Sequence, residues 1–201
     1  KIELLAGFQG ILMHDHETAL YHFGQGHAEC NVHILRYLRK NMEDTGNEWS
    51  ESMIALLTEM NGARKALIAA GKDSFEAEEI HKYKEMYAKT IEEGREQNRK
   101  TAYQHAKRRE AALLNRLDKY AENHLLFLHR FDVPFDDNMS ERDLRKAKNR
   151  QKMAGGFRKP SGLDMYCKIM TVLETAKRKH AGIMDSIKKI FSGSPAVFQT
   201  V

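Results

Sequence analysis

Apolar residues follow two different patterns along this chain, and the first, a short continuous run, predicts buried strands. The run GILMHD at 10–15 ends at an acid, which predicts a strand that carries Asp15 at its carboxyl end. The segment HAECNVH at 27–33 predicts a second short strand. Residues 17–26 between them favour a short helix that ends in glycines.

From Ile34 onward the apolar residues recur at steps of three and four, the rhythm of amphipathic helices. One stripe extends from Trp49 to Leu67, and others cover 80–91 and 113–125. Proline, which would interrupt a helix, first occurs at position 134. Residues 45–130 therefore predict a helical arm, which we expect to fold back on itself at 94–100.

The composition is that of a globular, basic protein without a disulfide framework. Hydrophobic residues make up 41% and charged residues 30% of the sequence. The 33 Lys and Arg residues outnumber the 28 Asp and Glu residues. The sequence pI of about 9.1 is compatible with a polyanionic partner. Cys30 and Cys167 are predicted to be free thiols. No apolar run approaches the about 18 residues of a membrane span, so we expect a soluble, cytoplasmic protein.

Two acids stand out by their positions as candidates for metal-dependent phosphoryl transfer. Asp15 ends the first predicted strand, and Glu141 lies in the first turn of a helix predicted to start at Asn138. Two-metal catalysis needs carboxylates that converge on cations about 3.5–4 Å apart. The pattern alone slightly favours plainer roles, because Asn138 and Glu141 also have the spacing of a capping box, and Asp15 suits a solvated strand end.

Histidines and a cysteine follow or flank Asp15 in the sequence, and a zinc site is one interpretation of them. His27, Cys30 and His33 offer C-x-x-H spacing, but zinc prefers four nitrogen or sulfur ligands and no second pair follows nearby. The spacing therefore makes a metal role the minor interpretation. His14 and His16 flank Asp15 and would point away from it in an extended chain.

A basic cluster follows Glu141 and is the candidate DNA-binding surface. Arginine and lysine bind phosphates without regard to sequence, although a solvated helix face remains an even alternative for any single residue. The loop GGFRKPSG at 155–162 lacks the spacing of a P-loop. The cluster comprises Arg142, Arg145, Lys146, Lys148, Arg150, Lys152, Arg158 and Lys159.

Longer motifs raise the catalytic interpretation above the plainer one. They are MHDHETALYHFGQGHAECNVHILRYL (13–38), ALLNRLDKY (112–120) with RFDVPFDDNMSERDLR (130–145), and QKMAGGFRKPSGLDMYCKIMTVLETAK (151–177). In this order they resemble the C-terminal part of a bacterial DDE transposase of the insertion sequence sixty-six family.

The resemblance implies an α/β ribonuclease-H-like catalytic core that is interrupted by a helical insertion. We expect a fragment that is mostly α with about two short strands. Its expected parts are a partial core at 1–44, the insertion arm at 45–130, and C-terminal core helices with the last catalytic acid at 131–201.

The resemblance also assigns catalytic roles. The family's middle Asp falls on Asp15, and the Glu of its D-N-x-x-E-R motif falls on Glu141, with Asp137, Asn138 and Arg142 matching the rest. These two acids would bind Mg²⁺ or Mn²⁺ and act on transposon and target DNA in a full-length enzyme that is a homo-oligomer. The family's first Asp has no match after Lys1, so we expect this fragment to be inactive alone.

Two rival functions remain open. The chain can be a non-catalytic helical DNA-binding or assembly remnant of a transposase, or a ribonuclease-H-like nuclease that hydrolyses DNA without strand transfer. An upstream strand that supplies an Asp would favour catalysis over the remnant. Strand-transfer assays would separate a transposase from a nuclease.

Overall fold

The computed structural model describes Leu5 and residues 7–193, without the side chains of Ser140, Glu141 and Ile190. It divides into two compact units, Lys1–Asp137 and Asn138–Val201, which we describe separately. The predicted mostly helical chain with two short strands is confirmed. The domain limits predicted at 44/45 and 130/131 stay predictions.

The first unit contains a pair of short parallel strands. Strand β1 (Ile11–His14) pairs with β2 (Gly26–Glu29), and the 3-10 helix η2 (Thr18–His22) lies in the connection. The prediction of a strand over 27–33 is wrong at its end. The carbonyl of Cys30 accepts hydrogen bonds from the backbone N–H groups of His33 and Ile34, so a helix begins directly after Cys30.

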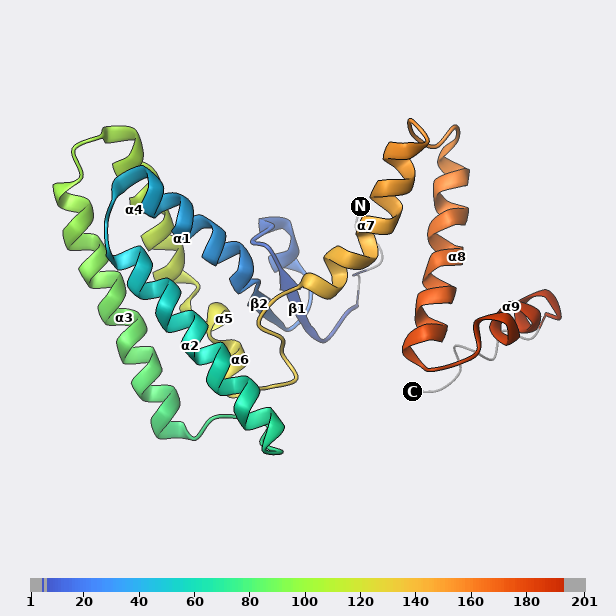
Figure 1. Cartoon of the computed structure of the whole chain (residues 1–201), viewed down its shortest axis with the longest axis horizontal. Helices are drawn as coiled ribbons and strands as arrows, with labels where there is room; N and C mark the ends of the chain where they lie inside the picture. Colours follow the sequence, from blue (N-terminus) through green and yellow to red (C-terminus); the bar gives the residue numbers. More distant parts are fainter. Residues whose placement is uncertain (1–4, 6, 194–201) are drawn as a thin grey trace. The chain divides into compact units, whose positions relative to one another are not determined.

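Four long helices form a closed bundle beside the strands (Figure 1). They are α1 (Asn31–Thr45), α2 (Trp49–Ala69), α3 (Ala77–Lys100) and α4 (Gln104–Lys119). Helix α1 packs on α2 and α4, and α3 also packs on α2 and α4. Two short helices, α5 (Ala121–His124) and α6 (Leu126–His129), follow the bundle.

The apolar stripe predicted from Trp49 onward forms the centre of this bundle. Trp49 and Leu57 are among its largest fully buried side chains. The arm folds back as predicted, but at 101–103, directly after the predicted range of 94–100, because α3 continues through Gly94 to Lys100. A Cβ atom at Gly94 would lie 2.6 Å from Leu114 Cδ2 and 2.8 Å from the Trp49 ring. This glycine therefore allows close helix packing and does not mark a turn.

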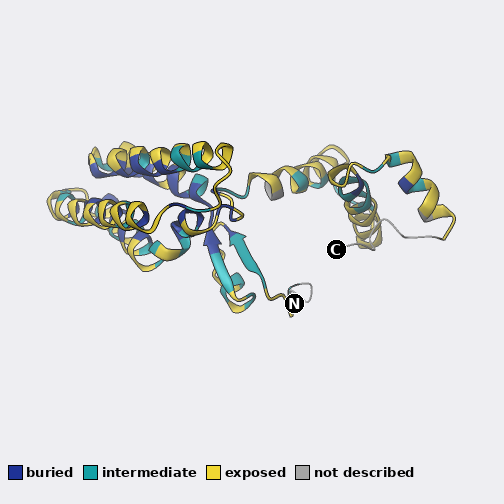
Figure 2. Ribbon diagram, turned by 90° about the horizontal axis from the view of Figure 1, so that it is seen from below, coloured by how far each residue is buried: buried dark blue, intermediate teal, exposed yellow. Residues whose placement is uncertain are grey.

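The second unit is built from the helices α7 (Asn138–Met153), α8 (Pro160–Arg178) and α9 (Ile183–Phe191). Figure 2 shows how little of it is buried compared with the bundle. Among its described side chains only Ala176 and Ser186 are buried.

No helix in the described part of the chain is long and apolar enough to cross a membrane.

Candidate active site at the strand ends

Asp15 lies at the carboxyl end of β1, as the sequence predicts. The strands pair in register from Ile11 with Gly26 to His14 with Glu29, and the Cys30 N–H donates to the His14 carbonyl at 2.9 Å. Asp15 and Cys30 therefore both follow the last pair of the same sheet edge. Asp15 is exposed. Carboxyl ends of parallel strands are the usual place for a binding site in such sheets.

The residues on either side of Asp15 are anchored. His14 is 3% exposed and packs edge-on against the ring of Tyr21, with centroids 4.7 Å apart. His16 has a φ of 72°, an uncommon left-handed conformation for a residue with a side chain. Its Nδ1 lies 2.5 Å from Oε1 of Glu29. Two fixed neighbours thus hold the turn that presents the exposed Asp15 carboxylate.

Glu29 is the centre of a buried polar network that the sequence did not single out. Its carboxylate is fully buried, and Arg116 donates from Nη2 to Oε2 at 2.7 Å while His124 Nε2 lies 3.0 Å from the same oxygen. The hydroxyl of Tyr21 donates to the other oxygen. Burial alone would raise the pKa of Glu29, but hydrogen bonds from His124, Tyr21 and Arg116 outweigh it. They hold that pKa well below its usual range.

His124 is buried with Glu29 on one side of its ring and Tyr87 on the other. Burial lowers the pKa of His124 despite the neighbouring carboxylate, so the ring is neutral at pH 7. A carboxylate only accepts, so Nε2 carries the proton that is donated to Glu29. The Tyr87 hydroxyl lies 2.9 Å from Nδ1 of this ring and donates to the Leu117 carbonyl at 3.2 Å. The network therefore joins β2 to α3, α4 and α5.

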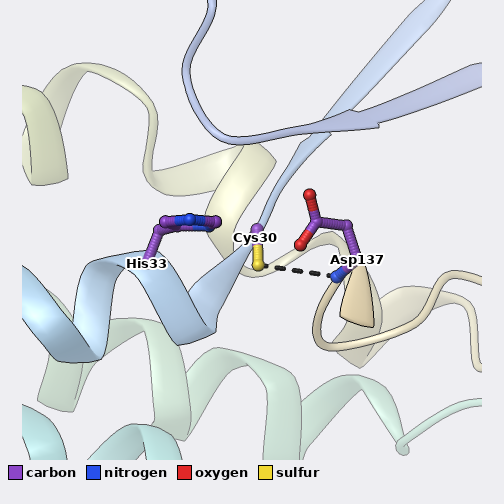
Figure 3. A group of neighbouring side chains, drawn as sticks. All are labelled: Cys30, His33 and Asp137. Carbon is purple, nitrogen blue, oxygen red and sulfur yellow. Dashed lines mark hydrogen bonds between the residues drawn. The ribbon is translucent and has the colours of Figure 1, made fainter. Parts of the chain in front are cut away.

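A second group of side chains gathers at the end of β2. Cys30, His33 and Asp137 place one ligand atom each within 4.8 Å of one another. Figure 3 shows Cys30 between the other two, with the Asp137 N–H donating to its Sγ at 3.5 Å. Burial, followed by the Asp137 side chain, raises the pKa of Cys30 to about 11. His27, the remaining member of the predicted trio, is not part of this group.

Glu141 lies on α7, whose backbone begins at Asn138 as predicted. Its side chain lies outside the described residues, so its predicted metal and capping roles both stay predictions. The predicted basic cluster, Arg142 to Lys159, is exposed at all eight positions. Lys146 also forms an ion pair with Glu174 at 2.6 Å. The helix thus presents a largely solvent-accessible basic surface.

Sequence reasoning missed Glu29, Arg116 and His124. One signal was present: an acid in the middle of HAECNVH, where a strand was predicted, needs a buried partner or an exposed face. Nothing in the sequence indicated which residues supply that partner, because Arg116 and His124 follow Glu29 by 87 and 95 positions.

Comparison with known proteins bears on the identity of the chain. Searches of curated proteins and of solved structures returned no match. The family model described as "Transposase IS66 family" matches residues 2–165. This range contains Asp15, the Glu29 network, Asp137 and Glu141, and it covers most of the chain. The chain therefore belongs to the IS66 family of transposases.

Proposed function

We propose that this chain is part of the catalytic domain of a DNA transposase, in which Asp15 and Glu141 bind Mg²⁺ or Mn²⁺. The full-length enzyme would cleave phosphodiester bonds and transfer strands on transposon and target DNA. The observation that carries the proposal is the exposed carboxylate of Asp15, held at the carboxyl end of a parallel strand in a chain of a transposase family. The ribonuclease-H-like core and a homo-oligomeric enzyme belong to the same proposal.

The donor set suits Mg²⁺. This ion prefers a few carboxylate oxygens and keeps water and phosphate oxygens as its other ligands. Asp15 is exposed, and no hydrogen bond or ion pair to its side chain occurs within the described residues. Bound there, Mg²⁺ would activate the attacking hydroxyl or water and stabilise the leaving oxygen.

Rigidity is what the chain itself contributes to Asp15. The network around Glu29 fixes His16, and the buried ring of His14 fixes the other side. Metal ligands need side chains held within about 0.5 Å of the productive geometry. We therefore assign Glu29 as a positioning residue for Asp15 and not as a metal ligand.

Covalent geometry limits how far Glu141 can lie from this edge. Glu141 follows Asp137 by four residues, so their Cα atoms are at most about 15 Å apart. Asp137 in turn donates its N–H to Cys30, directly after β2. The length of the backbone from Asp137 to Glu141 is thus compatible with a metal site shared by Asp15 and Glu141.

A strand-transfer assay with the full-length transposase tests the catalytic proposal. We expect Mn²⁺-dependent strand transfer to fall by at least about 1,000-fold in Asp15→Asn and in Glu141→Gln, because each removes a charged metal ligand. The control is Asp132→Asn, which removes an exposed acid paired with Arg130. Full activity in both site variants would refute the assignment. Hydrolysis without strand transfer would favour the nuclease.

The basic surface of α7 supports DNA contact and also suits the second candidate, a non-catalytic DNA-binding or assembly remnant. We expect a triple alanine variant of Lys148, Arg150 and Lys152 to bind DNA more weakly and with a shallower salt dependence. Each lost phosphate contact should reduce the slope of log K against log salt by about 0.9.

A charge-matched control distinguishes the effect of the α7 surface on DNA binding from the effect of the lost net charge. The triple alanine variant of Lys65, Lys82 and Lys89 removes three exposed lysines from the bundle and should leave the slope unchanged. Equal effects of the two triple variants would contradict a specific role for α7. DNA binding by a full-length protein that transfers no strands in Mn²⁺ would favour the remnant.

A further inference from the structure

We infer that Cys30, His33 and Asp137 form a binding site for a transition-metal ion of the zinc class. The three residues come from the end of β2, the first turn of α1 and the segment just before α7. Their ligand atoms, a sulfur, a nitrogen and an oxygen, lie within 4.8 Å of one another. This site is made of different residues from the Mg²⁺ site proposed above.

The spacing is close to what a tetrahedral ion requires. Zinc binds sulfur at about 2.3 Å and nitrogen or oxygen at about 2.0 Å, so two of its ligand atoms lie about 3.5 Å apart. The donors here, which lie within 4.8 Å of one another, must approach by about 1.5 Å at most. Rotation of His33 and Asp137, both half-buried, can supply this movement around the buried Cys30 (Figure 3).

The backbone that carries the three donors is held in place without the ion. The Asn31 N–H donates to the Phe135 carbonyl at 3.1 Å, and the Asp137 N–H donates to Cys30 Sγ at 3.5 Å. The Asn31 side chain donates to the His124 carbonyl at 2.9 Å. Because residues 135–137 are pinned to the start of α1, the oxygen donor stays beside the sulfur and nitrogen donors.

Helix geometry places the other two donors together. Residues three apart in a helix lie on the same face, and His33 follows Cys30 by three positions across the start of α1. Arg36 Nη1 lies 3.1 Å from His33 Nε2, in an exposed contact. An ion that binds His33 through Nε2 would replace this exposed contact with Arg36, and water would solvate the released guanidinium.

The donor types select the class of ion. A thiolate and an imidazole suit zinc, cobalt or iron, whereas Mg²⁺ prefers oxygen ligands alone. Binding replaces the thiol proton of Cys30, which is released to solvent, and requires a neutral His33. Three protein ligands leave the fourth zinc position for a water molecule. The bound ion would link the end of β2 to the segment that leads into α7.

Cobalt titration of the whole metal-free chain tests this site. Co²⁺ bound by a thiolate gives a sulfur-to-metal charge-transfer band and intense visible bands, which report the ligands without any activity assay. We expect one Co²⁺ per chain, displaced by Zn²⁺ and unaffected by excess Mg²⁺. The charge-transfer band should disappear in Cys30→Ala and persist in Cys167→Ala, which removes the exposed thiol of α8.

The other two ligands provide the decisive variants if Cys30→Ala fails to fold. Removing a zinc-bound residue should weaken Co²⁺ binding by at least about 10-fold, the lower bound seen for residues that only support ligands. We expect this in His33→Ala and Asp137→Asn, and no change in His27→Ala. Absence of the charge-transfer band in the wild-type chain, or binding that ignores His33 and Asp137, would overturn the site. Neither result bears on strand transfer by Asp15 and Glu141.

Discussion

The two units of this chain use charged residues in opposite ways. In the first unit the carboxylates of Glu29 and Glu110 are fully buried and are held by donors from several helices. In the described part of the second unit the charged groups pair at the surface, as Lys146 does with Glu174 at 2.6 Å. Figure 2 shows the matching contrast in overall burial.

This difference separates buried interactions, which stabilise the fold, from surface ion pairs, which contribute little to its stability. A buried carboxylate that loses its donors or its charge leaves unpaired polar groups in a low-dielectric interior. An exposed ion pair exchanges its partner for water at little cost. The comparison predicts that the stability of the chain depends on the acids of the first unit and hardly on those of the second.

The largest effect is expected from Glu29→Gln, compared with Glu174→Gln. Replacing Glu29 breaks a buried ion pair with Arg116, and such losses typically cost about 3–5 kcal/mol. Urea unfolding monitored by Trp49, the single tryptophan, measures the first unit, and far-UV circular dichroism follows both units. We expect no measurable change from Glu174→Gln. Equal stability of the two variants would remove the contrast.

A second large effect is expected at Glu110, where Glu110→Gln should destabilise the bundle by about 1–3 kcal/mol. The Glu110 carboxylate can only accept hydrogen bonds. The NH₂ group of a glutamine in its place would point a donor at other donors. The donors are Trp49 Nε1 at 2.7 Å, Asn41 at 2.9 Å, Asn47 at 2.8 Å, Asn98 at 2.8 Å and Thr101 at 3.2 Å.

The control for this substitution is Glu96→Gln on the exposed face of α3. Urea unfolding followed by Trp49 fluorescence compares the two variants. A loss of stability in Glu96→Gln as large as that in Glu110→Gln would show that charge, and not the buried donors, is responsible.

Two glycine substitutions sharpen the comparison within the bundle itself. Gly94→Ala should destabilise by about 1–3 kcal/mol, because the new methyl group meets Leu114 and Trp49. Gly62→Ala on α2 meets nothing within 4 Å and should stabilise by about 0.5–1 kcal/mol. Thermal unfolding of both variants checks this, and shifts of the same sign would contradict the packing explanation.

The smallest effect is a pH dependence carried by His124. Its lowered pKa in the folded state means that only the unfolded chain takes up the proton near pH 6.5, so stability is lost as the pH falls below that value. The lowered pKa of Glu29 adds a further loss at more acidic pH. We expect a lower urea midpoint at about pH 5.5 than at about pH 7.5, with a smaller difference in His124→Gln. If the urea midpoints of His124→Gln at the two pH values differ as much as those of the wild type, His124 is not the source of the pH dependence.

The sequence predicted those features that depend on local pattern. The spacing from Trp49 to Met60 predicted the buried face of α2, and the run before Asp15 predicted β1. Predictions failed where a residue serves a distant contact. The fold-back predicted at 94–100 lies at 101–103, because the packing partners of Gly94, Trp49 and Leu114, cannot be inferred from neighbouring residues.

The candidate site divides in the same way. The position of Asp15 and the exposed basic face of α7 follow from local sequence and the family resemblance. The role of Glu29 depends on partners brought close by the whole bundle, and the contact of Asp137 with Cys30 joins residues 107 positions apart. These contacts result from tertiary packing, and the spacing of apolar residues along the chain does not predict them.

The long sequence separation within the Glu29 network has a consequence for synthesis. His124 leaves the ribosome after Glu29 by 95 residues, which at about 5–20 residues per second is a delay of roughly 5–20 s. During that interval Glu29 lacks its buried partners, and the turn at Asp15 lacks its anchor. The nascent chain therefore gains an ordered strand end only after the helical bundle is complete, and an unfinished chain presents Asp15 on a segment that is not yet fixed.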